Sequence, residues 1–94
     1  MESTRLNKIG RLLQKELSDI FLLQTKAMPG TLVSVSVVRV SPDLSIARVY
    51  LSIFPSGKAP EILEAIRLNT KAIRFDLGQR VHLQLRKIPD LSFY

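Results

Sequence analysis

The chain contains no cysteine and only one histidine among its 94 residues. The absence of cysteine excludes disulfides, thiolate metal sites and cysteine nucleophiles. The single histidine, His82, has no acidic residue close to it in sequence and is a poor basis for a metal centre or for acid–base catalysis. We therefore expect no metal, no other cofactor and no small-molecule substrate, and we interpret His82 as a surface or interface residue.

Long apolar runs are missing as well. The apolar clusters are short, such as Phe21-Leu22-Leu23, whereas a membrane span needs about 18 or more consecutive apolar residues. Residues 1–8 have no apolar core behind a basic tip, which an export signal would require. These absences predict a cytoplasmic protein without a membrane partner.

Acidic residues are outnumbered. Eight Asp and Glu against 14 Lys and Arg give a formal charge of +6 and a pI near 10.2. This charge attracts polyanions and makes nucleic acid the first candidate partner, although basic charge can also serve solubility alone. We expect one monomeric domain over residues 1–94, because a chain of this length supports a single core that buries roughly 60–70% of its unfolded surface.

The segment from about Thr4 to Lys26 is predicted to form one long helix, capped by Ser3 or Thr4. Its apolar residues recur at helical spacing and should face the core: Leu6, Ile9, Leu13, Leu17 and Ile20. Roughly opposite them lies a stripe of cations: Arg5, Lys8, Arg11 and Lys15. This basic stripe is either a solvated helix face or a binding surface for a polyanion.

Two strands should follow the break at Met28-Pro29-Gly30. In residues 32–40 one face is predicted to carry Val33, Val35 and Val37, and the other Ser34, Ser36 and Val38. In residues 46–54 one face is predicted to carry Ala47, Val49, Leu51 and Ile53. A turn over residues 41–45, in which Asp43 accepts from the downstream backbone, should join them as an antiparallel pair. Arg39 and Arg48 would then lie near one another.

After the loop 55–60, a second helix is predicted from Pro60 to Gly78, with Glu61 and Glu64 near its positive end. Its apolar face comprises Ile62, Leu63, Ile66, Ile73 and Leu77. Asn69 and Thr70 interrupt this face and predict a kink or a split into two helices. One flank carries three cations at helical spacing: Arg67, Lys71 and Arg74.

Gly78 is expected to end this helix in a left-handed cap, and a third strand over residues 80–86 should follow. Its predicted faces are Val81, Leu83 and Leu85 on one side, and Arg80, His82, Gln84 and Arg86 on the other. The apolar tail, residues 89–94, should dock on the chain's own core or on a partner. The predicted fold class is α+β: helix, strand, strand, kinked or split helix, strand, with helices on one face of a three-stranded sheet.

Three motifs stand in a characteristic order: Ser41-Pro42-Asp43-Leu44-Ser45-Ile46-Ala47, then Ile73-Arg74 with Leu77-Gly78, then Ile88-Pro89-Asp90-Leu91-Ser92-Phe93. With Arg5, Ile9, Leu13, Glu16 and Leu17 in the first helix, the chain resembles the ribosome-binding factor A family over nearly its whole length. The resemblance implies a type II KH-like fold. It also implies a bacterial, cytoplasmic, non-enzymatic factor that binds the immature small ribosomal subunit and assists late maturation of its rRNA.

Ordinary KH domains clamp the nucleic-acid backbone with a GXXG loop. This chain has no such loop, because Gly10, Gly30, Gly57 and Gly78 include no pair three residues apart. The resemblance implies a helix–kink–helix instead, which in the family commonly carries a small residue and a glycine. The matching stretch here is Asn69-Thr70-Lys71, with Lys71 in place of the glycine.

We predict RNA binding through Arg67, Lys71, Arg74, Arg5, Lys8, Arg11, Arg80 and Arg86. Only Tyr50, Phe75 and Tyr94 are candidate rings for stacking, so sequence-specific base reading is not indicated. The alternative is a protein-interaction module that uses the sheet or the C-terminal tail, with basic charge for solubility only. An enzyme is not predicted, because no nucleophile–base pair, ligand cluster or phosphate loop is recognisable.

Overall fold

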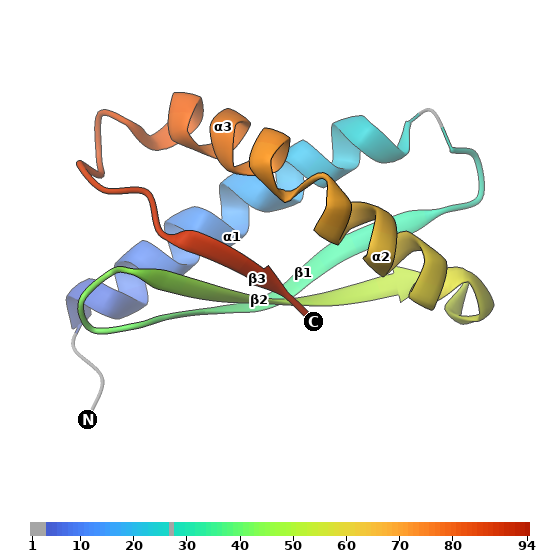
Figure 1. The fold of residues 1–94 in the computed structure, drawn as a ribbon, viewed down its shortest axis with the longest axis horizontal. Helices are drawn as coiled ribbons and strands as arrows, with labels where there is room; N and C mark the ends of the chain where they lie inside the picture. The colour runs from blue at the N-terminus through green and yellow to red at the C-terminus, as the bar shows by residue number, and fades with distance from the viewer. Residues whose placement is uncertain (1–3, 27) are drawn as a thin grey trace.

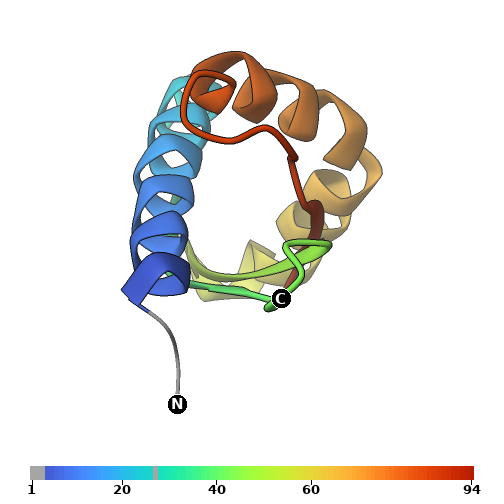
Figure 2. The ribbon, with the colours of Figure 1, turned by 90° about the vertical axis from the view of Figure 1, so that its left-hand side faces the viewer.

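The computed structural model describes residues 4–26 and 28–94. In chain order the elements are the helix α1 (Thr4–Thr25), the strands β1 (Leu32–Val40) and β2 (Ile46–Phe54), the short 3-10 helix η1 (Ser56–Lys58), the helices α2 (Ala59–Leu68) and α3 (Thr70–Val81), and the strand β3 (Asp90–Phe93) (Figure 1). The sheet order is β1-β2-β3, with β2 antiparallel to β1 and parallel to β3. The α-helices lie over one face of this sheet (Figure 2). The predicted α+β fold is confirmed.

α1 packs on β1 with the apolar face that the sequence predicts. Its buried side chains include Ile9, Leu13, Leu17 and Ile20, each worth about 1.5–3 kcal/mol on burial. Gly10 marks a close approach of the two elements, because a Cβ at this position would lie 3.0 Å from the carbonyl oxygen of Val38. The predicted cap Ser3 lies outside the described residues. No α-helix of the described chain has the length and apolarity needed to cross a membrane.

β1 and β2 have the predicted bounds, but the alternation in β1 does not continue to its end. The register shifts between Val35 and Val37, so that Val38 is buried and Val37 is 37% exposed. The prediction that Val37 shares a face with Val35 is therefore wrong, because one extra residue in a bulge reverses the faces beyond it. The Nε2 of Gln14 on α1 donates to the carbonyl oxygens of Val35 and Ser36 at this bulge, at 3.2 and 3.1 Å.

The turn between β1 and β2 is built around Asp43. Its Oδ1 accepts from the hydroxyls of Ser45 and Ser41 at 2.7 and 2.8 Å, and from the backbone N–H of Ser45 at 3.1 Å. These bonds, that of the Ser45 hydroxyl first, lower the pKa of Asp43 from 3.8 to about 2. The next residue, Leu44, has a φ of 62°, which is sterically disfavoured for its side chain. Contact of Leu44 with the core helps to hold this conformation.

The predicted end of the second helical region is wrong. α3 continues through Gly78 to Val81, and residues 80–86 do not form a strand. Val81 is buried but Leu83 is 86% exposed. The reason is that Val81 follows Leu77 by one helical turn and so fits the helical phase as well as the alternating one. Gly78 is helical and does not adopt the left-handed cap.

β3 is formed by the segment that was predicted to be a docking tail. Ile46 of β2 pairs with Asp90, and Val49 pairs with Phe93. Leu91 and Phe93 are buried, and the ring of Phe93 meets that of Phe21 edge to face at 5.9 Å. The tail therefore docks on the chain's own core. Its parallel direction follows because α2 and α3 carry the chain back across the sheet before β3 begins.

Candidate nucleic-acid interface

The predicted split between the two helices lies at Asn69, whose φ and ψ are −101° and 15°. Its backbone N–H donates to the carbonyl oxygens of Ala65 and Ile66, at 3.1 and 3.0 Å. The hydroxyl of Thr70 donates to the carbonyl oxygen of Arg67 at 2.7 Å, which satisfies an acceptor that a helix end leaves open. The split is confirmed, and it forms with a lysine, Lys71, where the resemblance implied a glycine.

Three predicted cations, Arg67, Lys71 and Arg74, flank this break, and we call them the α2–α3 flank. Arg67 donates from Nε and Nη2 to the carbonyl oxygen of Phe93, at 3.1 and 2.9 Å. Tyr94 bonds to β2 through both its N–H and its carbonyl oxygen. The preceding carbonyl, that of Phe93, therefore points away from β2, as alternation along a strand requires. Arg67 thus supplies a partner on the open side of β3.

Arg74 holds the start of the same strand. Its Nε donates to the carbonyl oxygen of Pro89 at 3.1 Å, and its Nη2 donates to that of Ile88 at 2.6 Å. The Nε also lies 3.6 Å from Oδ1 of Asp90. This ion pair is exposed and contributes little by itself, but the bonds to two carbonyl oxygens fix the guanidinium. Both arginines of the flank are thus engaged with β3 while their residues remain exposed.

Lys71 differs from the two arginines of the flank, because its side chain neither hydrogen-bonds to β3 nor forms an ion pair within residues 4–26 and 28–94. It is exposed. Leu68, at the end of α2, and Phe75 on α3 are 81% and 67% exposed. Around the break, the structure therefore exposes a cation and two apolar side chains.

Arg80 and Arg86 were predicted to lie on a strand, but neither does. Arg80 is on α3, and its Nη1 lies 3.8 Å from Glu16 Oε1 and 3.9 Å from Asp19 Oδ2 on α1. Arg86 is exposed in the segment between α3 and β3. Figure 1 places that segment at the end of the molecule where α1 begins. His82 is exposed, and a ring nitrogen lies 2.9 Å from the carbonyl oxygen of Gln79.

The first half of α1 keeps its predicted cations in solvent. We call Arg5, Lys8, Arg11 and Lys15 the α1 ridge. All four residues are exposed. None pairs with a carboxylate in the described part of the chain. The acids later on α1, Glu16 and Asp19, face Arg80 instead.

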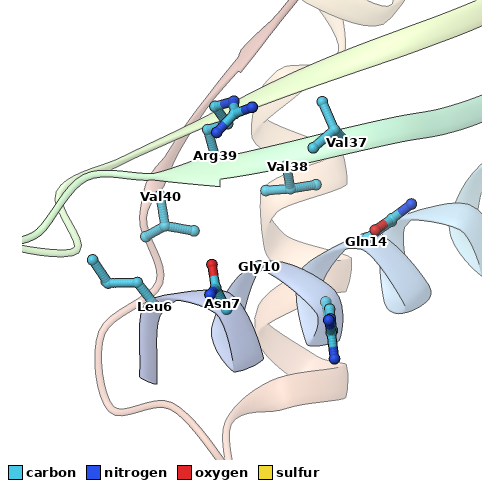
Figure 3. A pocket seen from close by; sticks show the side chains of 9 residues that line it. Leu6, Asn7, Gly10, Gln14, Val37, Val38, Arg39 and Val40 are labelled. Carbon is cyan, nitrogen blue, oxygen red and sulfur yellow. The ribbon is translucent and has the colours of Figure 1, made fainter. Parts of the chain in front are cut away.

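A pocket of about 280 Å³ lies between the start of α1 and the end of β1. Leu6, Asn7, Gly10, Arg11 and Gln14 line it from α1, and residues 37–40 line it from β1. In Figure 3, Val38 and Val40 point from β1 towards α1, whereas Arg39 points to the opposite side of the strand. Residues 4–26 and 28–94 contain no cluster of three or more potential ligands that would suit a metal ion.

Comparison with known proteins shows to which family the chain belongs. A family model described as ribosome-binding factor A matches residues 5–94. The chain belongs to this family. Ribosome-binding factor A of Flavobacterium psychrophilum is 52% identical over 96 residues, covering 100% of this chain and 74% of that protein. Ribosome-binding factor A of Chlorobaculum tepidum is 43% identical over 95 residues, covering 98% of this chain and 77% of that protein.

Solved structures of ribosome-binding factor A have the same fold. The crystal structure of the Thermus thermophilus protein matches with a TM-score of 0.74 and 26% identity, covering 95% of this chain and 93% of that chain. A homology model of the Thermus thermophilus factor, fitted into a cryo-EM map of a complex with the 30S subunit, matches with a TM-score of 0.68 and 28% identity. It covers 87% of this chain and 85% of that chain.

The anchoring of β3 by Arg67 and Arg74 is a feature that the sequence pattern did not predict. A signal for it exists in the spacing. The seven steps from Arg67 to Arg74 would span about 10.5 Å in an unbroken helix, and the four steps from Pro89 to Phe93 span about 13 Å in a strand. Two arginines on one flank can therefore reach both ends of a short strand beside it. This pattern becomes readable only once residues 90–93 are recognised as a strand.

Proposed function

We propose that this member of the ribosome-binding factor A family is a non-enzymatic, cytoplasmic ribosome assembly factor. In this proposal residues 1–94 form a single KH-like RNA-binding domain, which binds the immature small ribosomal subunit and assists late maturation of its rRNA. The observation that carries the proposal is the match to the Thermus thermophilus factor that was fitted into a 30S complex. The net charge of +6 supports an RNA partner.

The proposed phosphate contacts divide into two groups according to their surroundings. Arg5, Lys8 and Arg11 of the α1 ridge, together with Lys71 and Arg86, hold exposed charge that no carboxylate of the described chain neutralises. Arg67, Arg74 and Arg80 also belong to the proposed contacts, but each has a partner within the fold. We therefore assign most of the affinity to the first group. Each phosphate contact should change the log–log salt slope by about −0.7 to −0.9.

The alternative, a protein-interaction module, is weakened in one of its forms. That form uses the C-terminal tail, but the tail is a strand of the sheet with Leu91 and Phe93 in the core. A partner could take this segment only by removing β3. The form that uses the outer side of the sheet remains a distinct candidate, because α1, α2 and α3 leave that side uncovered (Figure 2).

Co-sedimentation tests the proposal directly. The protein should sediment with free small subunits, and best with immature ones, while leaving assembled ribosomes unbound. The variant Arg5→Glu/Lys8→Glu should lose this association. The variant Lys26→Glu/Lys58→Glu, which changes the same amount of charge at exposed lysines outside the proposed contacts, should retain it. Equal binding to small subunits and assembled ribosomes contradicts the assembly role, and equal losses in both variants contradict the assignment to the α1 ridge.

A further inference from the structure

The outer face of the sheet carries an ordered pattern of side chains that the proposed contacts leave unused. Cross-strand pairing places Val37 beside Tyr50 in one row, and Arg39 beside Arg48 in the next. β3 extends both rows, since Ser92 pairs with Arg48 and the ring of Tyr94 stacks on that of Tyr50 at 5.3 Å. An aromatic row and a basic row therefore lie side by side, about 6.6 Å apart along the strands.

The bulge in β1 creates this arrangement. Without the register shift between Val35 and Val37, strict alternation would turn Arg39 towards the helices and Val38 towards solvent. With the shift, Val38 is buried and pairs with the buried Val49. Arg39 then points to the side of β1 away from α1 (Figure 3), beside Arg48. Gln14 supports the bulge from α1 by donating to two of its carbonyl oxygens.

The basic row contains a hollow. A pocket of about 260 Å³ is lined by both arginines and by the turn that follows β1, with Arg39, Val40, Ser41, Pro42, Ile46 and Arg48 around it. Two guanidinium groups, those of Arg39 and Arg48, line this hollow. A guanidinium presents several N–H donors in a planar fork that matches the oxygens of a phosphate. The chemistry of the hollow therefore suits an anion of phosphate size.

The aromatic row suits an unpaired base. Each ring of the Tyr50–Tyr94 stack covers one side of the other, and Tyr94 remains 49% exposed. A base can extend such a stack, as bases do on the aromatic side chains of proteins that bind single strands. A duplex keeps its bases stacked on one another and has no free base face to offer. The pattern of rings beside cations thus favours a single strand over a helix.

We propose that the outer face of the sheet binds a single-stranded segment of RNA, with a phosphate in the Arg39–Arg48 hollow and a base on the Tyr50–Tyr94 stack. This inference rests on the proposed RNA-binding function and names the form of RNA that the sheet takes. It adds a second surface to the α1 ridge, on the side of the sheet away from the helices.

Tyrosine fluorescence gives a local readout, because the chain has two tyrosines and no tryptophan. A short oligoadenylate should quench this emission on binding, whereas a hairpin duplex at equal concentration should not. The variant Tyr50→Leu/Tyr94→Leu should lower the oligoadenylate affinity about tenfold, as loss of base stacking does. Tyr50→Phe/Tyr94→Phe keeps both rings and should retain the affinity, measured by anisotropy of labelled RNA.

Arg48→Gln provides a second test that leaves the tyrosines in place. It should lower the affinity and make the log–log salt slope shallower by about 0.7. Lys58→Gln removes one exposed charge beyond the other end of β2 and should have a smaller effect. Thermal unfolding of every variant checks that the fold is intact. Unchanged affinity in Arg48→Gln together with unquenched tyrosine emission overturns the inference.

Small-subunit binding separates this inference from the proposed function. If the wild-type protein sediments with small subunits but its tyrosines do not respond to oligoadenylate, the sheet assignment fails and the function stands. If the wild-type protein does not sediment with small subunits, the function fails whatever the oligonucleotide does. If Tyr50→Leu/Tyr94→Leu loses subunit binding with full oligoadenylate affinity, the sheet binds a protein, and the inference is overturned.

Discussion

The α1 ridge and the α2–α3 flank are two stripes of cations at the same helical spacing, and the fold treats them differently. The ridge borders solvent, and its charges have no carboxylate partner in the described chain. On the flank, Arg67 and Arg74 each give two hydrogen bonds to backbone carbonyl oxygens at or next to β3. Periodicity identifies which residues share a helix face, but what that face meets depends on a strand that starts 16 residues after Arg74.

The largest effect is expected when the charge of the ridge is reversed. Arg5→Glu/Lys8→Glu/Arg11→Glu should lower RNA affinity at least about a hundredfold at moderate salt, because attraction by three cations becomes repulsion. Thermal stability should change little, since these side chains are exposed. Filter binding across a salt series measures the affinity. If the affinity falls no further than it does in Lys26→Glu/Lys58→Glu, the ridge contributes only through the net charge of the protein and not as a binding surface.

On the flank, stability should respond more than binding. Arg67→Ala/Arg74→Ala should lower the free energy of unfolding by about 2–4 kcal/mol, because charge-assisted bonds to the carbonyl oxygens of Phe93, Pro89 and Ile88 are lost. Urea unfolding measures this change. The matched control is Lys71→Ala on the same flank, with an expected change within about 0.5 kcal/mol. Equal stability of the two variants would show that the arginines do not hold β3.

Two residues beyond the flank test where α3 ends. Val81→Ala should cost about 1.5–3 kcal/mol of unfolding free energy, because Val81 is 0% exposed and its loss leaves a cavity. Leu83→Ala should cost less than about 0.5 kcal/mol, since Leu83 is 86% exposed. Thermal denaturation of both variants measures the difference. Similar losses would favour the alternating strand that the sequence suggested for residues 80–86.

The smallest expected effect concerns Asp43. This carboxylate accepts hydrogen bonds from serine hydroxyls, whereas the arginines of the flank donate them to carbonyl oxygens. Hydrogen bonds from Ser45 and Ser41 lower the pKa of Asp43 from 3.8 to about 2. Because the folded pKa is the lower one, the resulting stability is present above the unfolded value and is lost as the pH falls from about 4 towards 2. Asp43→Asn should reduce this acid dependence of unfolding. An identical pH profile would mean that the turn does not depend on the carboxylate.

Much of the fold could be predicted because, apart from the bulge in β1, local patterns and tertiary structure agree in the first two thirds of the chain. Residues 32–40 and 46–54 are strands with the predicted bounds, since valine alternation and the Ser41–Ser45 turn favour the same hairpin. The interruption at Asn69 and Thr70 was also readable, because two polar residues replace apolar ones at the core-facing positions of the pattern.

The errors arise where the apolar residues fit both the period of a helix, about 3.6 residues, and the period of a strand, about two residues. The spacing of Val81 from Ile73 and Leu77 fits a helix, and its spacing from Leu83 fits a strand. Only packing in the folded protein decides between the two. The bulge after Val35 has no side-chain signature, because Val37 and Val38 are both valines. The roles of Arg67 and Arg74 could not be predicted for a related reason. Their partners are backbone carbonyl oxygens, which every residue possesses.

The two guanidiniums on β3 also bear on self-association. β3 is an edge of the sheet, and an edge with free backbone groups invites the strand of another molecule. Arg67 and Arg74 occupy the carbonyl oxygens of Phe93 and Pro89, so an incoming strand would have to displace both side chains before it could pair there. The same hydrogen bonds that hold the last strand in place should therefore discourage extension of the sheet by a second molecule.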